Sequence, residues 1–136
     1  MPVRSLHSSI LRWPDGDTVR QAARDWALAL LARDGNVKRV GYRGSHARGE
    51  EGVGSDLDWI IVLAHCELPF ERRATLFDSS DLPVPADLVV YTATEFAQVA
   101  ARGDRFAREL AEKTVWFFQP QDAERAEPWN PSDRDR

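Results

Sequence analysis

The sequence predicts a single domain of the α+β class, in which helices pack on a β-sheet. Three observations lead to this prediction. The chain has 136 residues, close to the roughly 150 of one typical domain. Its composition, 43% hydrophobic and 29% charged, is that of a globular protein with a buried core and excludes disordered and membrane-embedded classes. Apolar patterns with helical and with strand spacing interleave along the chain.

The first half of the chain predicts a helix, a strand and a loop. A helix is expected over residues 18–33, because Asp17 is a suitable N-cap and Gly35 a suitable stop. Its apolar stripe consists of Val19, Ala22, Ala23, Trp26, Ala29 and Leu30. Residues 37–42 alternate as a strand does, and the glycine-rich stretch 44–54 is expected to be a loop.

The second half predicts three strands and three helices. Residues 57–63 form a nearly continuous apolar run, as an interior strand does, and residues 88–91 predict a second short strand. Between them, residues 69–77 predict a helix with proline in its first turn. Helices ending near residues 102 and 113 follow, with Thr92 or Thr94 capping the first and Gly103-Asp104 starting the second. Residues 114–118 predict a last strand, in which Phe117 and Phe118 are expected in the core rather than in an exposed contact patch.

Charge and cysteine content set limits on the partners. The net charge of −4 argues against binding of nucleic acid by charge alone, so direct nucleic-acid binding is not expected. The longest apolar runs are far shorter than the ~18 residues of a spanning helix, and residues 1–20 lack the apolar core of a secretion signal. The single cysteine, Cys66, cannot form an internal disulfide. We therefore expect a cytoplasmic protein that does not contact the membrane.

The residues with most chemical information are Asp56 and Asp58, at the start of the apolar run 57–63. Residues two apart on a strand face the same side, about 7 Å from each other, so both carboxylates share one surface. Taken alone, such a pair is more often a solvated surface feature. Here it enters a strand that is expected to be buried, where carboxylates need partners or metal.

Asp87 opens the next predicted strand, and it joins the same cluster if that strand lies beside the first at about 4.8 Å. At roughly 5 Å and an effective dielectric constant of about 20, each like-charge pair costs about 3 kcal/mol. Bound divalent cations would offset this cost, and Mg²⁺ takes carboxylate oxygens as ligands. The three aspartates therefore predict a metal site.

The stretch before the acidic pair supplies a complementary feature. Gly44 lets the backbone approach a ligand closely, Ser45 carries a hydroxyl, and consecutive backbone amides can bind phosphate. Arg43 and Arg48 add positive charge nearby. A Gly-Ser pair alone is usually only a turn, but its combination with the acidic pair indicates a site for phosphate and metal.

Other nucleotide and catalytic motifs are absent from the sequence or weak. There is no G-x-x-x-x-G-K-[ST] phosphate loop, and the glycines have the wrong spacing for a dinucleotide fingerprint. His7, His46 and His65 lack the spacing of a zinc site. His46 lies within the phosphate-binding stretch, where it either contacts the nucleotide or, as is favoured, lies exposed to solvent. Cys66 lies beside His65 after the end of a predicted strand, with no orienting acid evident, and is expected to be a structural thiol.

Gly44-Ser45, followed after ten residues by Asp56-x-Asp58 and later by a third aspartate, resembles the nucleotidyltransferase superfamily that includes DNA polymerase beta. The fuller string, G-S-x-A-R-G-E and then S-D-L-D, is similar to its smallest branch, the minimal nucleotidyltransferases, often the antitoxin half of pairs with a helical HEPN partner. The likeness covers roughly residues 17–118. The chain departs from the common pattern at Arg43, where an apolar residue is usual, and at Trp59, where an aliphatic one is usual.

The resemblance implies a polymerase beta-like fold with a short mixed sheet, and it implies roles for particular residues. Asp56, Asp58 and Asp87 would be catalytic and would bind two Mg²⁺ ions, with Asp87 also helping to activate the acceptor hydroxyl. Gly44 and Ser45 would hold the nucleoside triphosphate, with Arg48 and Ser55 as further nucleotide contacts. Residues 1–118 would form the catalytic core, its motif-bearing part being 17–118, and residues 119–136 a loosely ordered C-terminal tail.

The function predicted from this resemblance is transfer of a nucleoside monophosphate from a magnesium-bound nucleoside triphosphate, with ATP expected, to a hydroxyl acceptor. A tyrosine of a partner protein is one such acceptor. The alternative is an antitoxin-type protein of a HEPN/MNT pair that acts mainly by docking its partner. A catalytically silent nucleotide sensor is a third hypothesis, which the presence of all three aspartates disfavours.

Overall fold

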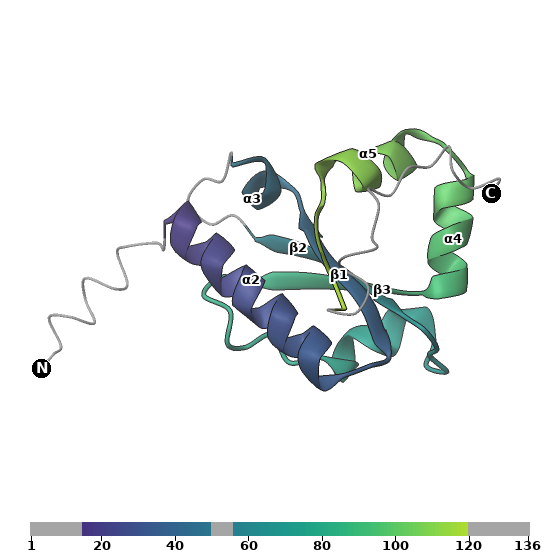
Figure 1. Ribbon diagram of the computed structural model, residues 1–136, viewed down its shortest axis with the longest axis horizontal. Helices are drawn as coiled ribbons and strands as arrows, with labels where there is room; N and C mark the ends of the chain where they lie inside the picture. Colours follow the sequence, from purple (N-terminus) through teal and green to yellow (C-terminus); the bar gives the residue numbers. More distant parts are fainter. Residues whose placement is uncertain (1–14, 50–55, 120–136) are drawn as a thin grey trace, which may run out of the picture.

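A four-stranded mixed sheet with strand order β3-β2-β1-β4 lies at the centre of the fold (Figure 1). The computed structural model describes residues 15–49 and 56–119. Strand β1 (Val37–Arg43) is antiparallel to β2 (Leu57–Leu63) and to β4 (Val115–Phe118), whereas β2 is parallel to β3 (Ala86–Thr92). The predicted α+β class, with helices on a short mixed sheet, is confirmed.

Helix α2 (Gly16–Arg33) packs along one face of the sheet. It begins two residues earlier than predicted, because its N-cap is Asp15 and not Asp17: the Asp15 side chain accepts a hydrogen bond from the Thr18 amide at 2.7 Å. Asp17 lies in the first turn, where it pairs with Arg20. The residues buried on this helix are Val19, Ala23, Trp26, Ala27, Leu30 and Leu31.

Helices α4 (Ala93–Ala101) and α5 (Arg105–Lys113) cover part of the opposite face (Figure 1). Thr92 starts α4 with a capping box: its hydroxyl accepts from the Glu95 amide, and the Glu95 carboxylate accepts from the Thr92 amide. Asp104 caps α5 by accepting from the Ala107 amide at 3.0 Å. Of the two caps proposed for α4, Thr92 is therefore the one used.

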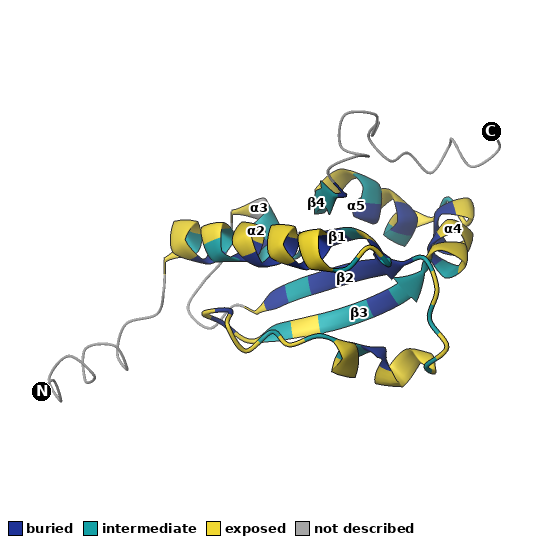
Figure 2. Cartoon of the chain, turned by 60° about the horizontal axis from the view of Figure 1, so that its bottom comes forward, coloured by how far each residue is buried: buried dark blue, intermediate teal, exposed yellow. Residues whose placement is uncertain are grey.

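Strand β2 is buried on both faces and separates two apolar clusters (Figure 2). Its residues Leu57, Trp59, Ile61 and Leu63 pack toward α2, whereas Ile60 and Val62 pack toward α4 and α5. Asp58 has the same strand parity as Ile60, so its side chain lies on the α4 and α5 face. The alternation of side chains along β2 therefore places the Asp58 carboxylate on the face of the sheet that α4 and α5 cover.

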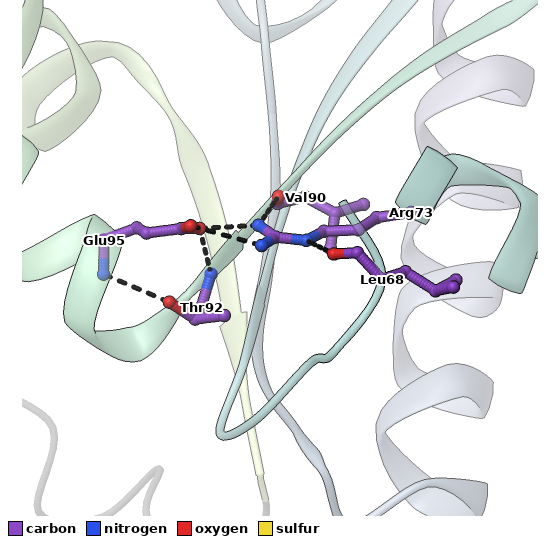
Figure 3. Close-up of polar contacts among 5 residues, drawn as sticks. All are labelled: Leu68, Arg73, Val90, Thr92 and Glu95. Carbon is purple, nitrogen blue, oxygen red and sulfur yellow. Dashed lines mark hydrogen bonds and ion pairs between the residues drawn. The ribbon is translucent and has the colours of Figure 1, made fainter. Parts of the chain in front are cut away.

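Phe70–Leu76 is a 3₁₀-helix, η1, at the β3 edge of the sheet, where a helix was predicted over 69–77. Arg73 anchors it (Figure 3). The guanidinium pairs with both carboxylate oxygens of Glu95, at 2.6 and 3.2 Å, and donates to the carbonyl oxygens of Val90 and Leu68 at 3.1 and 2.9 Å. One buried side chain thus joins η1, the edge strand and the start of α4.

The structure differs from the sequence prediction in the stretch 44–54, in the alternation of β1 and at Gln119, which was expected to belong to a loosely ordered tail. Residues 45–48 form one helical turn, α3 (Ser45–Arg48), within the stretch expected to be a loop, of which residues 50–55 lie outside the described residues. A register shift between Val37 and Arg39 brings Val37 to the α2 side together with Val40, against simple alternation. Gln119 is buried and donates to the carbonyl oxygens of Asp34 and Val37; residues 120–136 lie outside the described residues.

The aromatic residues lie largely as expected. Trp26 and Trp59 are buried with ring centroids 4.7 Å apart, and Trp116 packs against the second cluster. Phe117 packs against the first cluster, and Phe118 lies under the guanidinium of Arg39. Within residues 15–49 and 56–119, none of the helices has the length and hydropathy required to span a lipid bilayer.

Candidate functional site

Three charged residues lie side by side across neighbouring strands at one end of the sheet. Arg43 at the end of β1 is the register partner of Asp58 at the start of β2, and Asp58 is the register partner of Asp87 at the start of β3. Residues directly opposite each other on adjacent strands point to the same face. The sheet therefore places two carboxylates and one guanidinium in a row on the α4 and α5 face.

These three side chains line a cleft of about 520 Å³. Beyond the charged end, the cleft is lined by Trp59, Ile60, Leu88, Val89, Tyr91 and Phe106. It is therefore polar at the end where β2 and β3 begin and apolar and aromatic farther along the strands. A ligand with a charged part and a flat apolar part matches this division.

Gly44 is required by the geometry around Asp58. Its φ of 90° and ψ of −157° fall in a region that is nearly restricted to glycine. A Cβ atom at this position would lie 2.7 Å from Oδ2 of Asp58. The glycine of the predicted Gly-Ser pair thus lets the Asp58 carboxylate of the predicted acidic pair approach the backbone, and the structure brings these two residues together.

The Asp58 carboxyl has an unfavourable electrostatic environment. Burial raises its pKa above the ordinary value, and the neighbouring carboxylates of Asp87 and, to a lesser extent, Asp56 raise it further. Arg43 opposes this shift and lowers the pKa, as does His46. The negative charges of Asp87 and Asp56 thus both act on the Asp58 carboxyl.

The chemistry of this donor set fits Mg²⁺, which prefers carboxylate oxygens and keeps open positions for water and phosphate. Asp58 and Asp87 are adjacent across two strands, and Asp56 directly precedes β2. In the described part of the chain, no group of three or more His, Cys, Asp or Glu side chains is arranged to hold a metal ion. The predicted convergence of Asp56, Asp58 and Asp87 on one metal ion is therefore not observed, and their role as metal ligands stays a prediction.

The structure describes the remaining predicted site residues to different extents. Ser45 begins α3 next to Gly44 and is partly buried. Arg48 ends that helical turn, but its side chain is not among those described, and Ser55 lies outside the described residues. His46 is 1% exposed, so the expectation that it faces solvent is wrong: the helical turn directs it inward.

Sequence reasoning missed the walls of the cleft. Ile60, Val89 and Tyr91 follow from alternation, because they lie two or four residues after Asp58 and Asp87 on their strands. Phe106 comes from α5, far along the chain, and only the tertiary fold brings it to the cleft. The guanidinium of Arg43 lies 5.2 Å from the centroid of the Phe106 ring, so this residue is part of the site and not only a nearby charge.

Comparison with known proteins gives a family and a fold. Residues 25–117 match the nucleotidyltransferase domain family. Comparison with curated proteins finds no match. A solved structure from Sulfolobus solfataricus, provisionally assigned as a nucleotidyltransferase, has a TM-score of 0.54 at 19% sequence identity, over 78% of this chain and 85% of that one. A toxin–antitoxin structure with AMP-PNP has a TM-score of 0.43 at 17% identity, over 82% of this chain and 79% of that one.

Proposed function

This chain belongs to the nucleotidyltransferase domain family, and from that premise we propose that it binds a magnesium-complexed nucleoside triphosphate, with ATP the expected nucleotide, and transfers the nucleoside monophosphate to a hydroxyl acceptor. The fold is that of polymerase beta-like nucleotidyltransferases, as the sequence resemblance implied. The observation that carries the proposal is the register of Asp58 with Asp87 beside Gly44.

The residues have separate roles in this proposal. Asp56 and Asp58, with Asp87, would hold two Mg²⁺ ions, and Gly44 and Ser45 would bind the triphosphate. When bound, the metal ions would neutralise the triphosphate and lower the pKa of the acceptor hydroxyl. Asp87 is exposed at the start of the edge strand, which supports contact with an incoming acceptor.

The proposed reaction is a nucleotidyl transfer in which one bond to the α-phosphorus forms and another breaks. The acceptor oxygen forms a bond to the α-phosphorus, the bond from that phosphorus to the oxygen bridging to the β-phosphate breaks, and pyrophosphate leaves. The proton of the acceptor hydroxyl passes to the Asp87 carboxylate or to water. Since the protein supplies no covalent intermediate, its contribution is positioning and charge stabilisation.

A protein side chain is the acceptor class that the cleft supports best, a partner's tyrosine among them. Tyr91 lines the apolar end of the cleft, and its ring centroid lies 5.8 Å from that of Phe70. Phe70 is 48% exposed on η1. An exposed aromatic residue beside the cleft gives a partner an apolar surface from which a hydroxyl-bearing side chain can enter.

Label transfer tests the proposal. The protein is incubated with Mg²⁺, cell extract and each nucleoside triphosphate labelled at the α- or at the γ-phosphate, and labelled species are identified. We expect label from the α-position only, and its loss with Asp56→Asn, while the matched surface variant Asp81→Asn retains it. Transfer of γ-label, or full transfer by Asp56→Asn, would contradict the mechanism.

A second candidate function, docking of a HEPN-type toxin as its antitoxin, is favoured by the string G-S-x-A-R-G-E and S-D-L-D. The two functions can coexist if the partner is also the acceptor. They are separated by co-expressing the chain with a small helical protein encoded beside it. If Asp56→Asn still binds that partner and suppresses its toxicity, docking suffices; if suppression is lost while binding remains, transfer is required.

A further inference from the structure

Arg43 occupies an unusual position within the candidate site. It is the register partner of Asp58 and lines the same cleft as Asp58 and Asp87. The related nucleotidyltransferase pattern commonly has an apolar residue here. A guanidinium in this position therefore belongs to this chain and not to the general pattern of the family.

The guanidinium is held by contacts from α5. Its carbon lies 5.2 Å from the centroid of the Phe106 ring, a distance suited to a cation–π interaction. Nη2 lies 3.6 Å from Oε1 of Glu109, which is an ion pair but too long for a hydrogen bond. The other carboxylate oxygen of Glu109 accepts a 3.0 Å hydrogen bond from Nε of Arg105.

The donors of Arg43 are consequently available to a ligand. A guanidinium has five N–H donors, and among the described residues this one has no hydrogen-bond partner within 3.5 Å. Its side chain is 31% exposed, so bulk water has limited access. The ring and the loose ion pair fix its direction without using its donors.

An anion is the ligand that these donors fit. Guanidinium groups donate to phosphate oxygens with strong, directional, charge-assisted hydrogen bonds. A free anion would be repelled by Asp58 and Asp87, but phosphate that arrives with divalent cations would not be. A phosphate group in the cleft would then meet the divalent cations on the carboxylate side and the guanidinium of Arg43 on the other side.

We propose that Arg43 contacts the phosphates of the bound nucleotide from the α5 side of the cleft, and that Phe106 and Glu109 hold it in position before the nucleotide binds. The inference rests on the proposed function, because it requires a nucleoside triphosphate in this cleft. It adds a phosphate-binding residue that the sequence pattern does not contain.

The role of Arg43 is tested by the binding of ligands that carry three, two, one or no phosphates, under conditions in which no transfer takes place. Isothermal titration calorimetry with Mg²⁺ compares an ATP analogue carrying a methylene group between the α- and β-phosphates with ADP, AMP and adenosine. We expect Arg43→Gln to weaken binding of the triphosphate analogue about tenfold or more, to affect ADP less, and to leave adenosine unchanged. Arg72→Gln, which removes an exposed arginine outside the cleft, should bind the whole series like the wild type.

Two further results decide between phosphate contact and a structural role. Glu109→Gln removes the ion-pair partner that positions Arg43 but leaves the guanidinium and Phe106, so it should weaken binding of the triphosphate analogue less than Arg43→Gln does; a loss equal to that of Arg43→Gln would overturn the inference. An equal loss for all four ligands would also overturn it, and so would an Arg43→Gln variant that binds the analogue like the wild type. If the wild type binds no nucleotide at all, the proposed function fails together with the inference.

Discussion

Substitution of Gly44 by alanine perturbs the site and the backbone together. The residue has a φ of 90° and a ψ of −157°, where an L-residue costs about 1 to 3 kcal/mol. The added methyl group would lie 2.7 Å from Oδ2 of Asp58, closer than carbon and oxygen can remain. Either Asp58 leaves its rotamer or the β1 end moves, and overpacking of this kind costs about 1 to 3 kcal/mol more.

Two other glycines separate these contributions. Gly49 also has a positive φ, 73°, but a Cβ there would meet no atom within 4 Å. Gly49→Ala should therefore cost only the backbone term, about 1 kcal/mol. Gly35 has neither a positive φ nor a neighbour within 4 Å, so Gly35→Ala should be close to neutral. We expect Gly44→Ala to lose about 2 kcal/mol more than Gly49→Ala.

The assay measures the free energy of unfolding in urea, with and without Mg²⁺ and the methylene analogue of ATP. A ligand at a hundred times its dissociation constant stabilises the folded state by about 2.7 kcal/mol. The wild type and Gly49→Ala should gain this amount, and Gly44→Ala should gain much less, because its Asp58 carboxylate is displaced. If Gly44→Ala unfolds like Gly49→Ala and gains as much from the ligand, the close approach of Gly44 and Asp58 has no role in the site.

Three further predictions concern electrostatics and packing. The pKa of Asp58 is raised in the folded state, so ionisation of this carboxyl destabilises the folded protein as the pH rises through that pKa. Asp58→Asn should therefore raise the melting temperature of the metal-free protein at pH 7. This gain should vanish near pH 3, below the ordinary carboxyl pKa, where Asp58 is protonated in both states. Arg73→Met should cost about 2 kcal/mol in urea unfolding, since it removes the bonds to Glu95 and the buried Val90 carbonyl; less than 0.5 kcal/mol would contradict the anchoring role. Trp59→Phe should cost under about 1.5 kcal/mol, because the indole Nε1 of Trp59 has no hydrogen-bond partner in the described part of the chain, whereas a larger loss would reveal one.

Elements with strong local signals could be predicted from the sequence. The β2 boundaries, 57 and 63, were exact, because a run of β-branched and aromatic residues follows the acidic pair directly. The α5 start is confirmed, and Thr92 is one of the two caps predicted for α4, since Thr92 and Asp104 are capping residues whose backbone partners lie only three residues ahead. Such signals depend on neighbours along the chain and need no tertiary structure.

Features that depend on distant contacts could not be predicted. The burial of His46 results from a single helical turn within a glycine-rich stretch, where local propensity favours a loop. The predicted N-cap, Asp17, is wrong by two positions, because Asp15 is a capping residue of the same type and local propensity does not distinguish the two. Arg73 carries no local signal in the sequence, because its partners Glu95 and the Val90 carbonyl come from distant parts of the chain.

The position of the candidate site follows from the different elements that cover the two faces of the sheet. On the α2 side the first apolar cluster packs between the helix and the sheet, whereas on the other side the cleft of Arg43, Asp58 and Asp87 lies beside the second cluster, with Phe106 of α5 in its wall. A charged row can remain at the open end because Trp59, next to Asp58, is buried on the opposite face. Substitutions of the buried residues on the α2 face should therefore alter stability with little effect on nucleotide affinity, while Arg43→Gln should lower nucleotide affinity with little effect on stability.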